Sequence, residues 1–285
     1  RKQSNNALAN MANKLMNGDT AALATEINKT FQSISAGLPK LTPTHQHPAS
    51  LLPSIYTVTV QEVEKKLVAI KLNKASGPDE IPNWVLRDFA ESLSRPIAAI
   101  FNSSFREGFI PQLWKSADVV PLPKVNPPER LDKDLRPISL TPVISKVQEQ
   151  FVHSWLWDII KHRIDKGQYG AIKGSCTTFA LILMLNDWLK STDNSKDKNF
   201  IQIVLLDYAK AFDHIDPNIL ITKLEALDIP DCLLRWIESF LMDRQQRVRI
   251  GCQISEWIGI WGSVPQGSRR GVVCFIGMVS EVERW

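Results

Sequence analysis

An aspartate directly after a run of apolar residues is the first side chain whose position indicates a chemical role. Residues 201–206 are rich in Ile, Val and Leu, and Asp207 follows them. Such a run predicts a strand buried on both faces, and a carboxylate at its end would lie at a sheet edge, where α/β proteins usually bind ligands. Asp207 could bind Mg²⁺, accept a phosphoryl group or cap a helix, and alone it does not separate these roles.

Two basic residues accompany a predicted β-hairpin. Residues 117–123 and 135–138 are predicted to form its strands, joined by a long polar loop, and their prolines favour a position at a sheet edge. Lys124 directly follows the first strand and Arg136 lies in the second. Arginine offers a planar fork of donors to phosphate oxygens, while lysine acts as a point charge. A solvated surface cation is the alternative for each.

The elements that must position these residues are mostly helical. A helical pattern over 4–35, interrupted at Gly18, precedes a proline-rich linker from 37 to 53. Thr59 is a candidate N-cap, and residues 247–250 and 257–261 predict a second hairpin. Further helices are predicted from Thr59 to about 70 and over 83–107, 143–163, 176–189, 217–227 and 231–242.

The composition is that of an ordinary globular protein. The 285 residues include 34 Lys+Arg and 30 Asp+Glu, with 44% hydrophobic and 22% charged residues, which excludes a disordered or collagen-like chain. The four cysteines show no C-x-x-C spacing, so we expect reduced thiols in an intracellular protein of the cytoplasm or nucleus. No apolar run reaches about 18 residues, so no membrane span is expected. The chain starts at Arg1 without an initiator Met, which suggests a piece of a longer protein.

The segment that begins at Asp207 resembles a known motif. Residues 207–213, DYAKAFD, are similar to motif A of reverse transcriptases from non-LTR retrotransposons. Five further blocks resemble those of the same family in the same order and together cover roughly residues 57–268. They are LNKASGPDEIP at 72–82, VPLPK at 120–124, LRPISL at 135–140, QYG at 168–170 with Lys173, Gly174, Thr177 and Thr178, and VPQGS at 264–268, which looks like motif B.

The resemblance implies an α+β protein with the right-hand polymerase fold, containing the fingers and part of the palm but no thumb. It divides the chain into a helical N-terminal extension with a linker (1–56), a partial reverse transcriptase domain (57–268) and a divergent tail (269–285). The implied activity is RNA-directed DNA synthesis, with an RNA template, a DNA primer, dNTPs and Mg²⁺ as partners.

The resemblance also implies roles for individual residues. Asp207 would be the catalytic metal ligand, and Lys124 and Arg136 would contact the triphosphate of the incoming nucleotide. Phe212 would be the steric gate that excludes a ribose 2′-hydroxyl. The residues expected to help form the pocket for the nucleotide and template base are Gln266 and Gly267.

One part of the family pattern is missing from the sequence. The family's motif C supplies two adjacent aspartates, yet no Asp-Asp dipeptide occurs in this chain. Two-metal nucleotidyl transfer needs several carboxylates, so we expect the chain as given to be inactive. The alternatives are a non-catalytic RNA- or DNA-binding remnant and a piece that does not fold stably. Two groups of basic residues are candidates for contacts with template phosphates, with a solvated charged face as the alternative: Lys161, Arg163, Lys166 and Lys173, and Arg244, Arg247 and Arg249.

Overall fold

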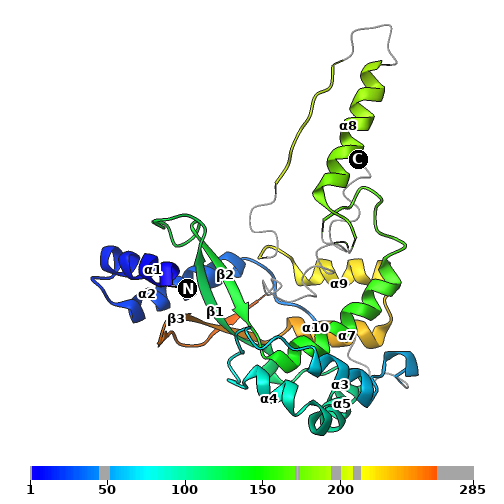
Figure 1. Cartoon of the computed structure of the whole chain (residues 1–285), viewed down its shortest axis with the longest axis horizontal. Helices are drawn as coiled ribbons and strands as arrows, with labels where there is room; N and C mark the ends of the chain where they lie inside the picture. The colour runs from blue at the N-terminus through cyan, green and yellow to red at the C-terminus, as the bar shows by residue number, and fades with distance from the viewer. Residues whose placement is uncertain are drawn as a thin grey trace.

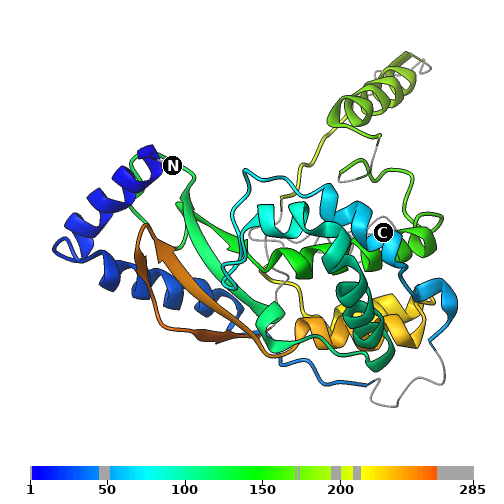
Figure 2. The ribbon, with the colours of Figure 1, turned by 60° about the horizontal axis from the view of Figure 1, so that its bottom comes forward.

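The computed structural model describes residues 2–44, 52–170, 172, 174–193, 200–207 and 213–261. Within these ranges the chain forms one mixed sheet, two helices on one face of the sheet and a separate group of packed helices (Figures 1 and 2). The fold is therefore a mixed helix-and-sheet structure, in agreement with the predicted α+β class. The division of the chain at residues 56 and 268 stays a prediction.

The sheet contains the predicted hairpin. Its order is β2 (Leu135–Leu140), β1 (Ser116–Pro123), β3 (Arg244–Ile250) and β4 (Gln253–Ile254), with β5 (Ile258–Ile260) also paired to β3. Strand β1 is antiparallel to β2 and parallel to β3, and the pairing with β3 ends at Val119. Pro121 and Pro123 lie beyond that point, where no amide donor is needed for β3. The prediction that a proline-containing strand lies at the edge is confirmed for β2.

Helices α1 (Lys2–Leu15) and α2 (Thr20–Ser35) cover one face of this sheet. Their apolar side chains form a core with alternate residues of the strands, and the buried members include Leu23, Ile27, Val119 and Val248. Gly18 separates the helices with a φ of +88°, and the Asp19 side chain then caps α2 by accepting hydrogen bonds from two backbone amides. The predicted interruption is therefore the boundary between two helices.

The second core belongs to the helical group. It is built mainly from α3 (Val60–Val68), α5 (Ala90–Glu107), α7 (Val143–Ile160), α9 (Pro217–Ala226) and α10 (Asp231–Leu241), with short helices η1 (Ser54–Tyr56), α4 (Asn83–Asp88) and α6 (Gln112–Lys115) at its margins. Aromatic rings fill its centre, and Phe101, Phe105 and Trp236 are each at most 1% exposed. Thr59 caps α3 in a complete capping box with Glu62, as its sequence position predicts.

The prediction of a buried strand at 201–206 is wrong. In the structure residues 200–207 belong to no strand, and Leu205 and Leu206 are 83% and 87% exposed. The preceding helix α8 (Thr177–Asp193) also has no buried residue, and Figure 1 shows both segments standing away from the other elements. β-rich composition supplies only a propensity, and no described strand pairs with 200–207 to make a ladder.

Candidate functional site

Lys124 and Arg136 lie on the face of the sheet opposite α1 and α2. In the antiparallel ladder Leu122 is directly opposite Arg136, and the backbone amide of Lys124 continues the pairing by donating to the carbonyl oxygen of Asp134 at 2.7 Å. Side chains alternate between the faces of a strand, so Lys124 and Arg136 are diagonal neighbours on one face. Both are exposed, which makes this open face basic at its outer end.

The loop of the hairpin is held by Asp134. The backbone amides of Glu129 and Arg130 both donate to its carboxylate at 2.9 Å. These two hydrogen bonds favour the ionised form and lower the pKa of Asp134 below its usual value. The loop therefore returns to β2 in a defined conformation, which fixes the position of Lys124 relative to Arg136.

A buried carboxylate organises the basic residues on the inner part of the same face. Asp118 is 1% exposed and accepts a hydrogen bond from Arg247 Nε at 2.6 Å and from Arg249 Nη1 at 3.3 Å. The guanidinium of Arg247 also lies 4.5 Å from the centre of the Trp257 ring. Two guanidinium groups share one carboxylate, so the three side chains together carry a net positive charge.

The third arginine of this group has a different position. Arg244 is 1% exposed and donates to the carbonyl oxygen of Phe240 at 3.0 Å, so it lies in the interior. The template contact considered for Arg244 is therefore excluded by its burial. Arg247 and Arg249 remain accessible, because their side chains are 20% and 37% exposed.

A groove of about 720 Å³ borders this open face. Its walls combine the ends of β1, β2 and β3 with the loop after α3, and the lining residues are Leu8, Leu72, Asn73, Lys74, Ala75, Ser76, Val120, Leu122, Leu140, Arg249 and Gly251. The groove therefore brings together residues of three of the sequence blocks, 72–82, 120–124 and 135–140.

The loop that forms one wall of the groove is fixed by close packing. The Asn83 side chain donates to the carbonyl oxygens of Lys71 and Lys74 at 3.0 and 2.8 Å. A Cβ on Gly77 would lie 2.4 Å from the backbone nitrogen of Pro142, so only glycine fits. Burial raises the pKa of the adjacent Asp79 carboxyl above its ordinary value. These contacts hold the 72–76 loop against the start of α7.

Asp207 does not lie at the end of a buried strand, as the sequence had predicted. It ends an exposed stretch without secondary structure, and the described residues contain no group of three or more His, Cys, Asp or Glu side chains that could hold a metal ion. The described surroundings of Asp207 therefore do not fit Mg²⁺. Phe212, Gln266 and Gly267 lie outside the described residues, and of the predicted site residues the structure brings together Lys124 and Arg136.

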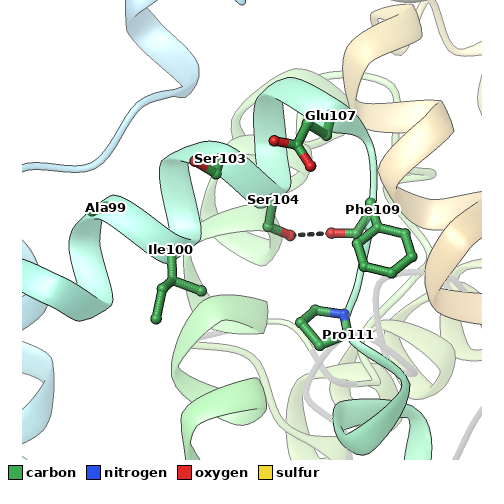
Figure 3. Close-up of a pocket in the computed structure, with 7 residues that line it drawn as sticks. All are labelled: Ala99, Ile100, Ser103, Ser104, Glu107, Phe109 and Pro111. Carbon is green, nitrogen blue, oxygen red and sulfur yellow. Dashed lines mark hydrogen bonds between the residues drawn. The ribbon is translucent and has the colours of Figure 1, made fainter.

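A second pocket of about 320 Å³ lies at the C-terminal end of α5 (Figure 3). Ile100, Phe109 and Pro111 give it an apolar lining, and Ser104 Oγ donates to the carbonyl oxygen of Phe109 beneath it. Ser104 also accepts a hydrogen bond from Trp236 Nε1 at 3.0 Å. The serine is thus engaged in holding the helix end, and none of the residues predicted to bind nucleotide lines this pocket.

Sequence reasoning missed two groups that shape the groove. Asp118 interrupts the apolar strand 117–123, and a lone acid in such a strand signals a buried ionic partner. Lys74 belongs to the block at 72–82, and nothing in its local sequence indicates that it lines the groove. The contact of Asp118 with Arg249 depends on the parallel pairing of β1 with β3, which sequence spacing does not specify.

Comparison with known proteins identifies the family. The family model "Reverse transcriptase (RNA-dependent DNA polymerase)" matches residues 122–285, which is more than half of the chain. The chain therefore belongs to the reverse transcriptase family. The motif resemblance to reverse transcriptases of non-LTR retrotransposons is confirmed.

Three curated relatives come from Drosophila melanogaster. The chain is 29% identical over 223 residues to "Probable RNA-directed DNA polymerase from transposon BS", which covers 78% of this chain and 24% of the relative. It is 29% identical over 228 residues to "RNA-directed DNA polymerase from mobile element jockey" (79% and 24%). It is 30% identical over 216 residues to "Probable RNA-directed DNA polymerase from transposon X-element" (75% and 23%). The chain thus spans about a quarter of the length of these relatives.

None of the helices in the described ranges is both long enough and apolar enough to cross a membrane.

Proposed function

We propose that this chain forms the nucleotide- and template-binding part of an RNA-directed DNA polymerase, with the sheet of β1–β5 as its fingers subdomain. The observation that supports this most directly is the placement of Lys124 and Arg136 on one open face of the hairpin. Membership of the reverse transcriptase family and the names of the relatives support the same reaction class.

In this proposal Arg136 and Lys124 bind the triphosphate of an incoming dNTP. The planar guanidinium of Arg136 donates two hydrogen bonds to phosphate oxygens, and the ammonium of Lys124 neutralises a further charge. Phe212 selects against a ribose 2′-hydroxyl, and Gln266 and Gly267 bind the base. We assign these three roles from the motif resemblance alone.

Catalysis is the second part of the proposal. Asp207 is the motif A carboxylate, but the sequence contains no Asp-Asp pair, and the described residues gather no metal site around it. We therefore propose that this 285-residue chain binds nucleotide and nucleic acid without extending a primer. Primer extension on an RNA template with Mg²⁺ tests this, with Asp207→Ala as the control. If the unmodified chain incorporated more nucleotide than the Asp207→Ala variant, the proposal that it does not extend a primer would be refuted.

Nucleotide binding needs a separate measurement, because it does not depend on catalysis. Charge-assisted hydrogen bonds contribute about 1.5–3 kcal/mol, so Arg136→Ala should weaken dNTP binding at least about tenfold. Arg95→Ala is the matched control, since Arg95 is exposed on α5 in the helical group. Equal dNTP affinity of the two variants would contradict the assignment of Arg136.

A second candidate is a nucleic-acid-binding remnant with no nucleotide site. The basic groove beside β1 and β3 favours this reading, because it contains cations outside the predicted triphosphate contacts. RNA binding that remains intact while no dNTP binding is detected would select this candidate over the first.

A further inference from the structure

Part of the predicted linker is attached to the helical group. Residues 40–44, which we call the strap, belong to no helix or strand. The amide of Thr42 donates to Asn218 Oδ1 on α9 at 3.0 Å, and Asn218 Nδ2 donates to the carbonyl oxygen of Lys40 at 3.2 Å. One side chain of α9 therefore fixes two backbone groups of the strap, much as a neighbouring strand would.

The other end of the strap is anchored on α10. The amide and the hydroxyl of Thr44 both donate to Glu238 Oε1 at 3.0 Å, and Glu238 is 3% exposed. Hydrogen bonds to a carboxylate are stronger than those between neutral groups, and this carboxylate is shielded from water. The amides of residues 42 and 44 are the ones used, while Pro43 between them has no amide to leave unpaired. The position of this proline is therefore compatible with a strap that is bound along one side.

The strap also contacts the end of the sheet. Lys40 Nζ lies 4.1 Å from the centre of the Trp261 ring, which is within the range of a cation–π contact. A Cβ built on Gly259 of β5 would lie 3.4 Å from the same ring, so the ring covers the backbone of that strand. Trp261 is therefore in contact with both the strap and β5, and the strap connects it to α9 and α10.

Trp261 lies directly before one of the motif blocks. The block VPQGS at 264–268 starts three residues after Trp261, and Gln266 follows it by five residues. A chain spans at most about 3.6 Å per residue, so a fixed Trp261 confines Gln266 to within about 18 Å of it. Contacts that hold Trp261 therefore also restrict where the block can lie.

We propose that the strap positions the pocket for the base of the incoming nucleotide. Lys40 holds Trp261, so that the block 264–268, which contains the two residues proposed to bind the base, starts from a fixed point. Lys40 is a positioning residue that acts through Trp261 and not on the nucleotide itself. A pocket that is already ordered loses less conformational entropy when a nucleotide binds, which raises its affinity. The inference rests on the proposed function, because base binding by this block is part of it.

Hydrogen exchange of the full chain, measured by mass spectrometry on peptides that cover 262–268, tests the positioning without any nucleotide. Lys40→Met keeps the length of the side chain and removes its charge. Because Lys40 is exposed, the loss of its cation–π contact should speed exchange in these peptides about two- to fivefold. Lys40→Arg keeps a cation over the ring and should exchange like the unmodified chain. Lys29→Met is the matched control, since Lys29 is exposed on α2 and lies outside the strap, and it should leave exchange unchanged.

Asn218→Ala tests the anchoring of the strap on α9. It removes both hydrogen bonds to the strap while Lys40 and Trp261 are still present, so exchange in 262–268 should rise as it does in Lys40→Met. The Asp216 side chain caps α9 through the backbone amide of residue 218, so the start of the helix is retained. If circular dichroism nevertheless shows loss of fold, the Lys40 variants decide.

The affinity for dNTP is the second readout. Lys40→Met should weaken dNTP binding by the same two- to fivefold factor, and Lys40→Arg should bind like the unmodified chain. The proposal is overturned if Lys40→Met and Lys29→Met show equal exchange in 262–268, or if Lys40→Arg exchanges as fast as Lys40→Met. Faster exchange with unchanged dNTP affinity would also overturn it, because the strap would then hold a segment that does not bind nucleotide. If the unmodified chain binds no dNTP while Lys40→Met still exchanges faster, the nucleotide assignment alone is refuted.

Discussion

Replacing Gly77 with alanine perturbs the packing that holds one wall of the groove. The added Cβ would lie 2.4 Å from the nitrogen of Pro142, 2.5 Å from the carbonyl carbon of Thr141 and 2.7 Å from the Cα of Pro142. All three are backbone atoms at the start of α7, and Thr141 is buried, so no flexible side chain can move aside. The 72–76 loop must shift instead.

The expected cost follows from this geometry. Overpacking costs about 1–3 kcal/mol, and three backbone contacts shorter than 3.0 Å place Gly77→Ala at about 3 kcal/mol of lost folding free energy. Gly37→Ala is the matched control, because its Cβ would meet nothing within 4 Å. That control should be neutral or stabilise by up to about 1 kcal/mol, since alanine restricts the unfolded chain.

Urea unfolding followed by circular dichroism measures both variants. Gly77→Ala should have the lower free energy of unfolding by about 3 kcal/mol. Equal stability of Gly77→Ala and Gly37→Ala would refute the close approach of the loop to α7.

Three other substitutions have defined outcomes. Asn28→Ala removes the buried amide that bonds Ser255 and Gln246, so unfolding free energy should fall by about 2 kcal/mol in urea titrations. Thr59→Ala should cost about 1 kcal/mol by loss of the α3 cap, measured in the same way. Burial raises the pKa of Asp79 above 3.8, so its ionisation destabilises the fold: the unmodified chain should lose stability relative to Asp79→Asn as pH rises above 3.8.

The controls for these variants differ. Lys29→Ala, one residue after Asn28 but exposed, should change the unfolding free energy by less than about 0.5 kcal/mol. For Asp79, unfolding of both proteins at several pH values between about 3 and 6 gives the difference. A difference that stays constant with pH, or that grows in favour of the unmodified chain, would contradict the raised pKa.

Local signals predicted the elements well where the cause is local. Thr59 indicated the start of α3, and the structure adds Glu62 as its capping-box partner. Gly18 indicated an interruption of the first helical segment, and the structure adds Asp19 as the cap of α2. The hairpin of β1 and β2 was predicted because its strands are consecutive, and its register then placed Lys124 and Arg136 together.

The sequence could not predict which strands pair when they are far apart along the chain. Residues 201–206 have the composition of a buried strand, yet burial depends on neighbouring strands, and none of the described strands pairs with them. Conversely, Asp118 and Arg249 are separated by more than a hundred residues, and the parallel pairing of β1 with β3 alone brings them into contact. The groove could not be predicted for the same reason, because its lining residues come from segments that are far apart along the chain.

The central claim is that the open basic face binds the triphosphate of a dNTP through Arg136 and that the strap positions the base pocket through Lys40. The most direct test measures dNTP affinity for the unmodified chain, Arg136→Ala, Lys40→Met and the control Arg95→Ala side by side. We predict that Arg136→Ala lowers dNTP affinity at least about tenfold and Lys40→Met about two- to fivefold, while Arg95→Ala leaves it unchanged. Equal dNTP affinity of all three variants would contradict the claim.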